Sequence, residues 1–345
     1  MRSLVVEENG AVSIREVPLP EYGEYEMLVK VKASAVCGTD MKILHNALKG
    51  WTNYPTMLGH EGVGEVVEIG SKVRNYKVGD MVVMPLIFGK CGEYFSTWGA
   101  MSEYAVAGDA PALQEDGIPL DEIRAYSAYV AQNRISEQLD PVSATMIITF
   151  REVYSTMKRL KFQKGQNIVI YGAGPVGMTF ITFAKQIGMA PVVCVDIIED
   201  KIAQAKRTGA DIVINSRKDD ANAEIRKLFP KGADILLDAA GVSELINENV
   251  KLVKEFGQVC VYGVTPKNEL LISWQEAPYA FDLRFVQWPS KYEEAAVSDE
   301  VVQMMLEGKL NGMDFISDVF AFDQAVEAIE FFMKGKNSKK IVLQF

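Results

Sequence analysis

A glycine-rich turn between a buried strand and a helix constrains this 345-residue chain more than any other feature. In the segment IVIYGAGPVGM, residues 168–178, an apolar run leads into the pattern G-x-G-x-x-G and then into residues spaced for an amphipathic helix. A strand before the glycines and a helix after them are the context in which this pattern indicates a dinucleotide site. The sequence therefore predicts an α/β unit that binds a dinucleotide.

Each position of this turn has a physical task in such a site. Gly172 permits the tight turn, Gly174 lets the backbone approach a pyrophosphate, and Gly177 allows the helix to pack closely on the strand. Pro175 and Val176 open the helix, whose free N–H groups favour an anion. The alternative is a structural glycine turn without a ligand.

A carboxylate in the expected place selects the form of the cofactor. Asp196 ends the apolar segment PVVCVD, nineteen residues beyond Gly177. A carboxylate there accepts hydrogen bonds from the ribose 2′-hydroxyl and repels a 2′-phosphate. The residues that follow, IIED, include no arginine for such a phosphate. The sequence therefore predicts NAD rather than NADP.

Strand-like and helix-like segments alternate after the glycine turn, which predicts a doubly wound parallel sheet of the Rossmann type. The segment ELLISW, residues 269–274, is one of its expected strands. The first part of the chain consists instead of short alternating segments, including a hairpin around Asn9-Gly10, and predicts a small antiparallel or barrel-like β domain. We expect domains at residues 1–148 and 149–284, with 285–345 returning to the first.

Charge and cysteine content exclude several classes of function. The 36 basic residues face 46 acidic ones, and a net charge of −10 disfavours binding to nucleic acid or to an anionic membrane surface. The sequence shows neither a transmembrane stretch nor an apolar signal segment at its start. Four cysteines are too few for a disulfide framework, so we expect a protein of the reducing cytoplasm that acts on small molecules.

Three residues of the first domain are of the types that hold a catalytic zinc ion. Cys37 lies in the tetrapeptide CGTD, and His60 and Glu61 follow about twenty residues later between glycines. Zinc in enzymes takes three such ligands and keeps a fourth position open. A core cysteine and a structural turn histidine are the alternatives. Only two histidines occur in the chain, which favours a special role for His60.

The segment GHEGVGEVVEIGSKVRNYKVGD, residues 59–80, resembles the signature of the zinc-dependent medium-chain dehydrogenase/reductase (alcohol dehydrogenase) family. CGTD, the glycine turn and the closing segment KIVLQF lie where that family has them, so the resemblance covers essentially the whole chain. It is strongest to the polyol (sorbitol dehydrogenase-like) and threonine dehydrogenase branches. The resemblance implies a GroES-like catalytic domain beside the Rossmann domain.

The same resemblance assigns the metal ligands. Cys37 and His60 would bind zinc, as would Glu61 in the polyol branch. Asp140, in the segment DPVSA, matches a further acidic position and would bind directly or through water. Asp40 would hold the His60 tautomer by accepting from its second ring nitrogen.

Two departures from the family limit what can be transferred. The region of the structural zinc site contains only Cys91, which predicts one catalytic zinc and no structural zinc. The family's proton relay often has a histidine five residues after the zinc cysteine, and here that residue is Lys42. His45 is either a substitute for it or a surface residue. Thr39 would accept the proton of the substrate hydroxyl.

These residues together predict an oxidoreductase that oxidises a secondary hydroxyl of a polyol, sugar or cyclitol with NAD and zinc. Trp51, Asn53 and Tyr54 would supply polar and aromatic walls, and Arg284 would reach the substrate or form a surface ion pair. The alternatives are a threonine-type amino-alcohol dehydrogenase, a zinc-free reductase of the same superfamily, and an NAD-binding protein without catalysis. A homodimer or homotetramer is expected, with ELLISW as the pairing strand.

Overall fold

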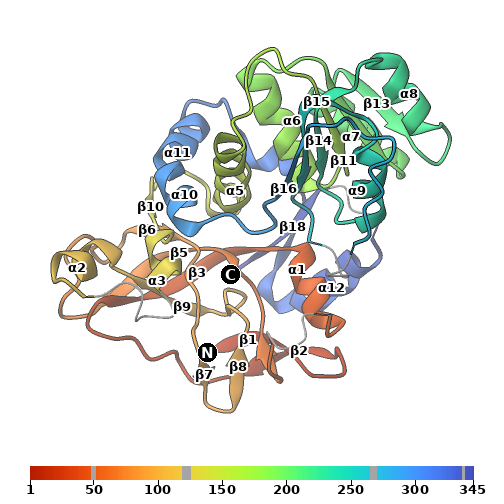
Figure 1. Ribbon diagram of the computed structural model, residues 1–345. Coiled ribbons are helices and arrows are strands. Elements are labelled where there is room, and N and C mark those ends of the chain that lie inside the picture. The colour runs from red at the N-terminus through yellow and green to blue at the C-terminus, as the bar shows by residue number, and fades with distance from the viewer. Residues whose placement is uncertain (48–51, 119–125, 265–269, 336–338) are drawn as a thin grey trace. The chain divides into compact units, whose positions relative to one another are not determined.

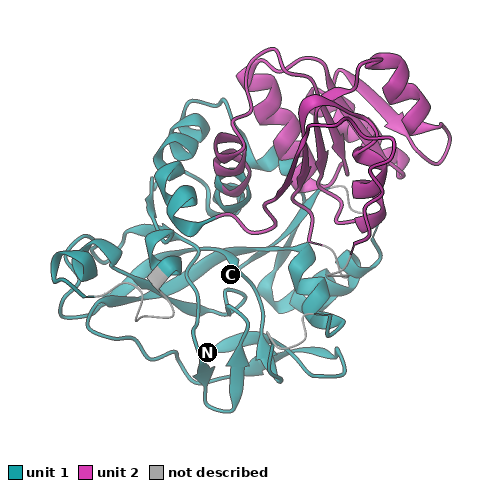
Figure 2. Cartoon of the chain, viewed as in Figure 1, with its two compact units in different colours: residues 1–151, 290–345 teal, residues 152–289 magenta. Residues whose placement is uncertain are grey.

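The structure is a computed structural model, and it describes residues 1–47, 52–118, 126–264, 270–335 and 339–345. The chain forms two compact units (Figure 2). Unit 1 comprises Met1–Arg151 and Ser290–Phe345, and unit 2 comprises Glu152–Pro289. The chain passes from unit 1 to unit 2 after Arg151 and returns to unit 1 after Pro289. Both positions lie a few residues beyond the boundaries expected from the sequence. In the described part of the chain, no helix has the length and apolarity needed to span a membrane.

Unit 2 is built on a six-stranded parallel sheet (Figure 1). Its strands are β11 (Ile168–Tyr171), β12 (Val192–Asp196), β13 (Ile212–Asn215), β14 (Ala233–Asp238), β15 (Val253–Val261) and β16 (Asp282–Phe285). They lie in the order β13-β12-β11-β14-β15-β16, which is the doubly wound order with its reversal between β11 and β14. The glycine turn follows β11, so it lies at the reversal, where ligands bind in such sheets. The Rossmann prediction is confirmed.

The helices of unit 2 either lead into β11 or connect consecutive strands from β11 to β15. They are α5 (Met146–Arg159), which begins in unit 1, α6 (Pro175–Ile187), α7 (Glu199–Thr208), α8 (Ala221–Leu228) and α9 (Ser243–Asn249). All four residues of β11 are buried, as the continuous apolar run IVIY predicts for a strand covered on both faces. This central strand fixes the position of the glycine turn.

The strand expected at ELLISW is wrong for the residues that the structure describes. Leu270 to Trp274 form no strand, and β16 occupies the last place in the sheet beside β15. Leu270 and Ile272 pack against the core while Leu271 is 90% exposed. This alternation of packed and exposed residues gives the sequence the pattern expected of a strand. Strand pairing needs a partner as well, and β15 pairs with β16 instead.

Unit 1 contains two β-sheets. The five-stranded sheet consists of β2 (Val12–Glu16), β1 (Arg2–Val6), β4 (Thr56–Met57), β8 (Tyr94–Ser96) and β7 (Lys90–Cys91). The seven-stranded sheet consists of β10 (Arg134–Ile135), β6 (Met81–Val83), β5 (Glu61–Ile69), β3 (Glu26–Val36), β18 (Lys340–Gln344) and β17 (Ile316–Ala321), with β9 (Tyr104–Gly108) also paired to β3. The expected hairpin is present, because β1 and β2 pair antiparallel.

The helices of unit 1 lie at the ends of these strands or in the returning segment. They are α1 (Gly38–Leu44), α2 (Ala110–Glu115), α3 (Tyr126–Val130), α4 (Pro141–Ala144), α10 (Lys291–Ala296), α11 (Ser298–Leu306) and α12 (Ala325–Met333). The short 3-10 helices Gly312–Phe315 and Phe322–Gln324 complete the set.

The long strand β3 brings distant segments together. It pairs antiparallel with β5 on one side and with β18 on the other. Ala35 lies opposite Glu61 on β5 and opposite Val342 on β18, so the three side chains share one face of the sheet. The returning segment therefore completes the sheet that carries the candidate site.

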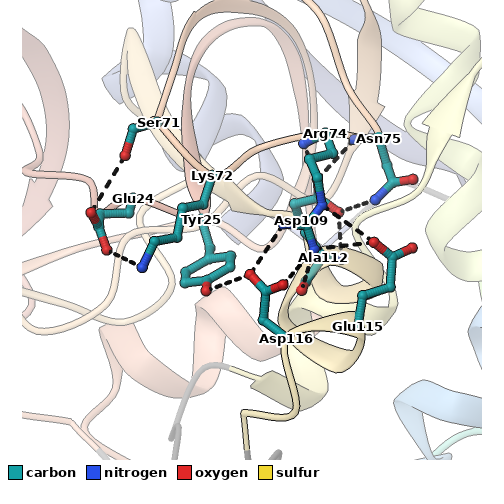
Figure 3. Close-up of polar contacts among 10 residues, drawn as sticks. All are labelled: Glu24, Tyr25, Ser71, Lys72, Arg74, Asn75, Asp109, Ala112, Glu115 and Asp116. Atoms are coloured by element: carbon teal, nitrogen blue, oxygen red, sulfur yellow. Dashed lines mark hydrogen bonds and ion pairs between the residues drawn. The ribbon is translucent and has the colours of Figure 1, made fainter.

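A buried carboxylate fixes the connection that leaves β5 (Figure 3). Asp109 accepts hydrogen bonds from the backbone N–H groups of Arg74 (2.7 Å) and Asn75 (2.9 Å), and from Ala112 in the first turn of α2 (3.1 Å). The Arg74 guanidinium also pairs with carboxylates at the end of α2. One side chain thus joins the loop after β5 to a helix.

Candidate functional site

The first part of the candidate site is the junction of β3 and α1. Cys37 caps α1, and its backbone N–H donates to the Asp40 carboxylate at 2.8 Å. The second Asp40 oxygen, Oδ1, lies 3.8 Å from His60 Nδ1. Asp40 is fully buried, bonded to the cysteine backbone and close to the histidine without a hydrogen bond to it.

A glycine with a left-handed backbone precedes the histidine. Gly59 has a φ of +98°, and a Cβ atom there would lie 2.6 Å from the backbone N of Met101. No other residue fits both the conformation and the space. Gly59 therefore sets the turn through which the chain reaches His60 and enters β5.

Glu61 begins β5 and forms a buried ion pair with Lys340 at the start of β18. The Lys340 ammonium donates to both oxygens of the Glu61 carboxylate. The side chains are only 3% and 4% exposed. β3 lies between the two strands and presents the small side chain of Ala35 opposite Glu61, which leaves room for the pair.

The ligand atoms of three residues converge. Those of Cys37, His60 and Glu61 all lie within 4.8 Å of one another, and this is the only such group in the described part of the chain. Thiolate, imidazole and carboxylate are the ligand types that zinc takes in proteins, and a tetrahedral ion needs them a few ångströms apart. His60 Nδ1 and Asp40 Oδ1 are buried without a hydrogen-bond partner. The donor set therefore fits a zinc ion.

The ionisable groups of the cluster shift one another's pKa values. Burial by itself would lower the pKa of His60. Interactions with Cys37, Asp40 and Glu61, of which that with Cys37 is the largest, outweigh that effect and raise the pKa of His60 to about 10. Burial also raises the pKa of Asp40. A metal ion that binds His60 would have to displace the proton that this raised pKa retains.

Asp140 is not part of this group. It is exposed at the N-terminus of α4, where its carboxylate accepts from the Ser143 N–H at 2.8 Å. An aspartate before proline is a common way to begin a helix, because its oxygen satisfies a free N–H group. A metal contact of Asp140, direct or through water, stays a prediction.

The candidate proton-transfer residues lie on α1 or at its end. The Cys37 thiol lies 3.9 Å from the Thr39 hydroxyl, and both residues are half-buried. Lys42 is half-buried one turn further along, and its burial lowers the pKa of the ammonium. His45 is exposed at the end of α1, with Nδ1 2.7 Å from the Met41 carbonyl.

The residues expected to line the substrate site lie in different surroundings. Trp51 lies outside the described residues, and Asn53 is exposed. The Tyr54 hydroxyl donates to the Ile43 carbonyl at 2.6 Å, so it supports α1. Arg284 donates to Asp282 at 2.7 Å on the exposed strand β16, which is the surface ion pair that the sequence left open.

In unit 2, the glycine turn has the geometry that its three glycines predict. Gly172 has a φ of +103°. A Cβ atom on Gly177 would lie 1.8 Å from the Gly172 carbonyl oxygen, so only glycine fits at the start of α6. Gly174 caps α6, with Pro175 and Val176 next, and no atom lies within 4 Å of a Cβ built on it. The open position is therefore Gly174, where a ligand can approach.

Asp196 lies beside this turn at the end of β12. One carboxylate oxygen accepts from the Ala173 N–H at 2.7 Å, and the other accepts from the N–H groups of Ile197 and Ile198. The half-buried carboxylate is thus fixed next to the glycines. Its contact with a ribose stays a prediction.

The sequence analysis missed two residues of the site, Lys340 and Trp98. Lys340 is 279 residues away from Glu61, and only the pairing of β18 with β3 brings them together. Trp98 lies beside His60, with ring centroids 5.1 Å apart. Neither residue belongs to a local motif, although a lysine at the start of a buried strand is a signal that a partner must exist.

Comparisons with known proteins agree with this geometry. Residues 23–114 match the family model described as "Alcohol dehydrogenase GroES-like domain", and residues 175–282 match "Zinc-binding dehydrogenase". The alcohol dehydrogenase of Geobacillus stearothermophilus is 33% identical over 282 residues, covering 79% of each chain. The sorbitol dehydrogenase of Bacillus subtilis is 26% identical over 347 residues (98% of this chain, 95% of that one). The L-threonine 3-dehydrogenase of Pyrococcus horikoshii is 29% identical over 348 residues (95% and 94%).

Proposed function

The chain belongs to the zinc-dependent medium-chain dehydrogenase family, and on that basis we propose that it oxidises a secondary hydroxyl of a polyol, sugar or cyclitol to the ketone, with NAD as hydride acceptor. Members of this alcohol dehydrogenase family are oxidoreductases, and the resemblance to them extends over both units. The observation that carries the proposal is the convergence of the Cys37, His60 and Glu61 ligand atoms within 4.8 Å, beside the Thr39 hydroxyl.

Cys37, His60 and Glu61 would hold one zinc ion. When bound, zinc acts as a Lewis acid and lowers the pKa of a substrate hydroxyl toward neutrality. Asp40 would then accept from His60 Nδ1, which keeps the other ring nitrogen free for the metal. Lys340 holds Glu61 in place and limits the negative charge of the cluster.

Proton removal falls to residues on α1. The Thr39 hydroxyl lies next to Cys37, so it is placed to accept the proton of a substrate hydroxyl at the metal and to donate its own proton onward. Lys42, one turn along the helix, is the base that we propose at the end of this path. Its lowered pKa makes neutral lysine available at a lower pH than in solution.

Unit 2 would bind the cofactor, which accepts the hydride. The open position of Gly174 and the N–H groups of Val176 and Gly177 would take the pyrophosphate. Asp196 would accept from the ribose 2′-hydroxyl, which supports NAD over NADP. We also propose a cytoplasmic protein, since all four cysteines are free.

The test of the proposed function is cofactor reduction with a panel of polyols, cyclitols, sugars, threonine and simple alcohols. Each substrate is tried with NAD and with NADP, before and after removal of zinc by prolonged dialysis against a chelator, with the metal content measured. We expect chelator-sensitive reduction of NAD by a polyhydroxy compound, restored by added zinc. Activity that persists in metal-free protein would contradict the zinc site, and a preference for NADP would contradict the role of Asp196.

Two alanine substitutions separate cofactor binding from folding. Gly177→Ala places a methyl group 1.8 Å from a backbone oxygen, so we expect a clear loss of thermal stability. Gly174→Ala meets no protein atom within 4 Å, so stability should be unchanged. NAD affinity should nevertheless fall by about tenfold or more, because the methyl group occupies the space of the pyrophosphate. Melting temperatures and calorimetric titration with NAD measure both effects, and full NAD affinity in Gly174→Ala would contradict the proposed site.

The proton path is tested by Lys42→Met. We expect kcat near neutral pH to fall by about tenfold or more, since a positioned base contributes at least that much. In the wild type kcat should rise with pH as Lys42 loses its proton, and in the variant this rise should disappear. Added primary amines should restore part of the rate. His45→Gln is the control and should behave as wild type, whereas a loss confined to His45→Gln would assign the base to His45 instead.

A threonine-type dehydrogenase is the second candidate, because such a relative matches nearly the whole chain. An amino acid substrate needs a cation for its carboxylate. The arginine that the sequence offered for this purpose, Arg284, pairs with Asp282 on β16. This pairing favours a neutral polyhydroxy substrate, and the panel above includes threonine to decide.

We propose a homodimer formed through β16, the last strand in the order of the parallel sheet. Antiparallel pairing of two β16 strands about a two-fold axis at Leu283 would place Asp282 of each copy opposite Arg284 of the other. The exposed side chains of Phe285 and Leu271 would gain cover.

Charge reversal tests this dimer. Arg284→Asp should shift the protein toward the monomer, because like charges then face each other across the axis. The double variant Asp282→Arg/Arg284→Asp restores opposite charges and should restore the dimer. Sedimentation at several protein concentrations measures the mass. A wild-type monomer, or a dimer indifferent to these changes, would contradict the interface.

A further inference from the structure

Two neighbouring strands of unit 2 end beside the carboxylate that would bind the ribose of the cofactor. β12 and β13 are parallel and in register, with Asp196 opposite Asn215 at the carboxyl ends of both strands. The Ser216 N–H donates to the Asp196 carbonyl at 3.1 Å, so the pairing continues one residue beyond β13. The backbone of the next residue, Arg217, is therefore held close to the end of the strand that carries the carboxylate.

The turn after β13 fixes the backbone at Arg217. The Asn215 side chain accepts from the Arg217 N–H at 3.1 Å, and its own amide donates to Glu199 in the first turn of α7 at 2.7 Å. The Asn215 carbonyl accepts from the N–H groups of Lys218 and Asp219, both at 2.9 Å. Asn215 is only 9% exposed, so a buried residue determines where the side chain of Arg217 begins.

Two cations follow Asn215, and they differ in their partners. Lys218 donates to the Glu199 carboxylate at 2.7 Å. Arg217 is exposed, and no group in the described part of the chain bonds to its guanidinium. A guanidinium without a partner, on a backbone that is fixed, is available to a ligand of opposite charge. Its planar fork of donors matches the oxygens of a phosphate group.

The spacing of the two strands lies within the reach of an arginine. Neighbouring strands are about 4.8 Å apart, and an extended arginine side chain is longer than this spacing. A side chain without a partner is free to rotate, so its orientation is set by the ligand that it meets. Arg217 can therefore bring its guanidinium beside the ribose that Asp196 would bind.

The surroundings of Asp196 reduce its repulsion of a phosphate. Its carboxylate accepts from three backbone N–H groups, at 2.7, 2.7 and 2.9 Å, which belong to Ala173, Ile197 and Ile198. Hydrogen bonds of this kind offset part of the negative charge that a ribose phosphate would meet. The four residues after Asp196 contain no arginine, but the end of the next strand supplies one.

We propose that Arg217 binds the 2′-phosphate of NADP, so that the enzyme uses NADP as a second cofactor besides NAD. This inference rests on the proposed function and extends its cofactor class. Asp196 repels a phosphate and bonds to a hydroxyl, so NAD remains the better cofactor. Arg217 narrows the difference, because its charge pairs with the phosphate and has no equivalent partner on NAD.

The test compares the two cofactors in Arg217→Ala and Arg217→Lys. With the preferred alcohol, we expect Arg217→Ala to lower kcat/KM for NADP by about tenfold or more, through KM, and to change kcat/KM for NAD by less than about threefold. Arg217→Lys should be intermediate, because an ammonium keeps the charge but loses the two-bond geometry. Arg226→Ala is the matched control. Arg226 lies in the last turn of α8 in the same unit, 3.6 Å from Glu276, and its loss should leave both values unchanged.

A binding measurement needs neither zinc nor an alcohol. The full chain is titrated in a calorimeter with 5′-AMP and with 2′,5′-ADP, which differ only in the 2′-phosphate. Wild type should bind both, and Arg217→Ala should lose affinity for 2′,5′-ADP alone, by about tenfold or more. Added salt should weaken the binding of 2′,5′-ADP more in wild type than in Arg217→Ala.

The other outcomes separate this inference from the proposed function. Equal losses for the two ligands in Arg217→Ala would place the guanidinium on the base or the sugar, and no loss would place it outside the site. Wild type that binds 5′-AMP but not 2′,5′-ADP would mean that Asp196 excludes the phosphate. Each of these results overturns this inference alone and leaves NAD binding intact. Wild type that binds neither ligand would overturn the proposed function as well.

Discussion

Cys37→Ser should abolish stoichiometric zinc binding and lower kcat/KM for the preferred alcohol by about 10³-fold or more. Cys37 is one of the three candidate metal ligands that converge in the described part of the chain, and a serine hydroxyl is a far weaker zinc ligand because it stays protonated at neutral pH. Lewis-acid activation is worth several kcal/mol in the transition state, and about 4 kcal/mol corresponds to a factor of 10³ in rate.

The control is the same chemical change at a buried cysteine outside the ligand group. Cys91 lies in β7 of the same unit and is not part of the ligand group. Cys91→Ser should keep one zinc per chain and wild-type kcat/KM, although some thermal stability is lost. Elemental analysis and steady-state kinetics measure both variants. Full activity in zinc-free Cys37→Ser would exclude this site as the catalytic centre, and equal zinc loss in Cys91→Ser would place a metal near Cys91.

Lys340→Met should destabilise the metal-free protein by about 3–5 kcal/mol, because it leaves the buried Glu61 carboxylate without its cation. Zinc should reduce this deficit, since the metal offers Glu61 another positive partner. Denaturant unfolding, followed for unit 1 with and without zinc, measures the difference. The double variant Lys340→Met/Glu61→Gln removes both charges and should recover much of the metal-free stability.

The pH dependence of the deficit has a definite sign. In the wild type, burial raises the pKa of Glu61, but Lys340 and His60 outweigh it, and the pKa lies below the usual 4.5. Its charge therefore stabilises the fold above the unfolded pKa, and this stabilisation is lost as pH falls through the folded pKa. Without Lys340, the effect of burial gains weight, and protonation of Glu61 becomes less costly. The deficit of metal-free Lys340→Met should thus be largest near neutral pH and shrink on acidification. A deficit independent of pH and zinc would mean that Lys340 acts by packing alone.

Zinc and protons should also compete for the imidazole of His60. The imidazole pKa of about 10 in the metal-free cluster means that the ring carries a proton at neutral pH, which the metal must displace. Zinc affinity should therefore rise with pH through the neutral range. The two substitutions described above act on this same cluster. Cys37→Ser removes a ligand, while Lys340→Met adds net negative charge to the same cluster.

The sequence by itself determined the parts that local pattern encodes. The buried run IVIY and the spacing of Gly172 and Gly177 determine a strand, a tight turn and a helix whose packing admits only glycine. The alternation around Asn9-Gly10 determines a hairpin, because side-chain period and turn chemistry act over a few residues. ELLISW shows the limit, since an alternating pattern does not decide which segment pairs with β15.

Only the tertiary structure decided the chemistry around Cys37. Glu61 meets Lys340 because β18 returns to pair with β3, and Trp98 meets His60 because its segment is bonded to the backbone beside Gly59. A local pattern identifies neither partner, because charge pairing and aromatic contact depend on distance in space, not on separation along the chain. The motifs predicted the three side chains that converge, while the sheet register and the main-chain bonds decided which neighbours surround them.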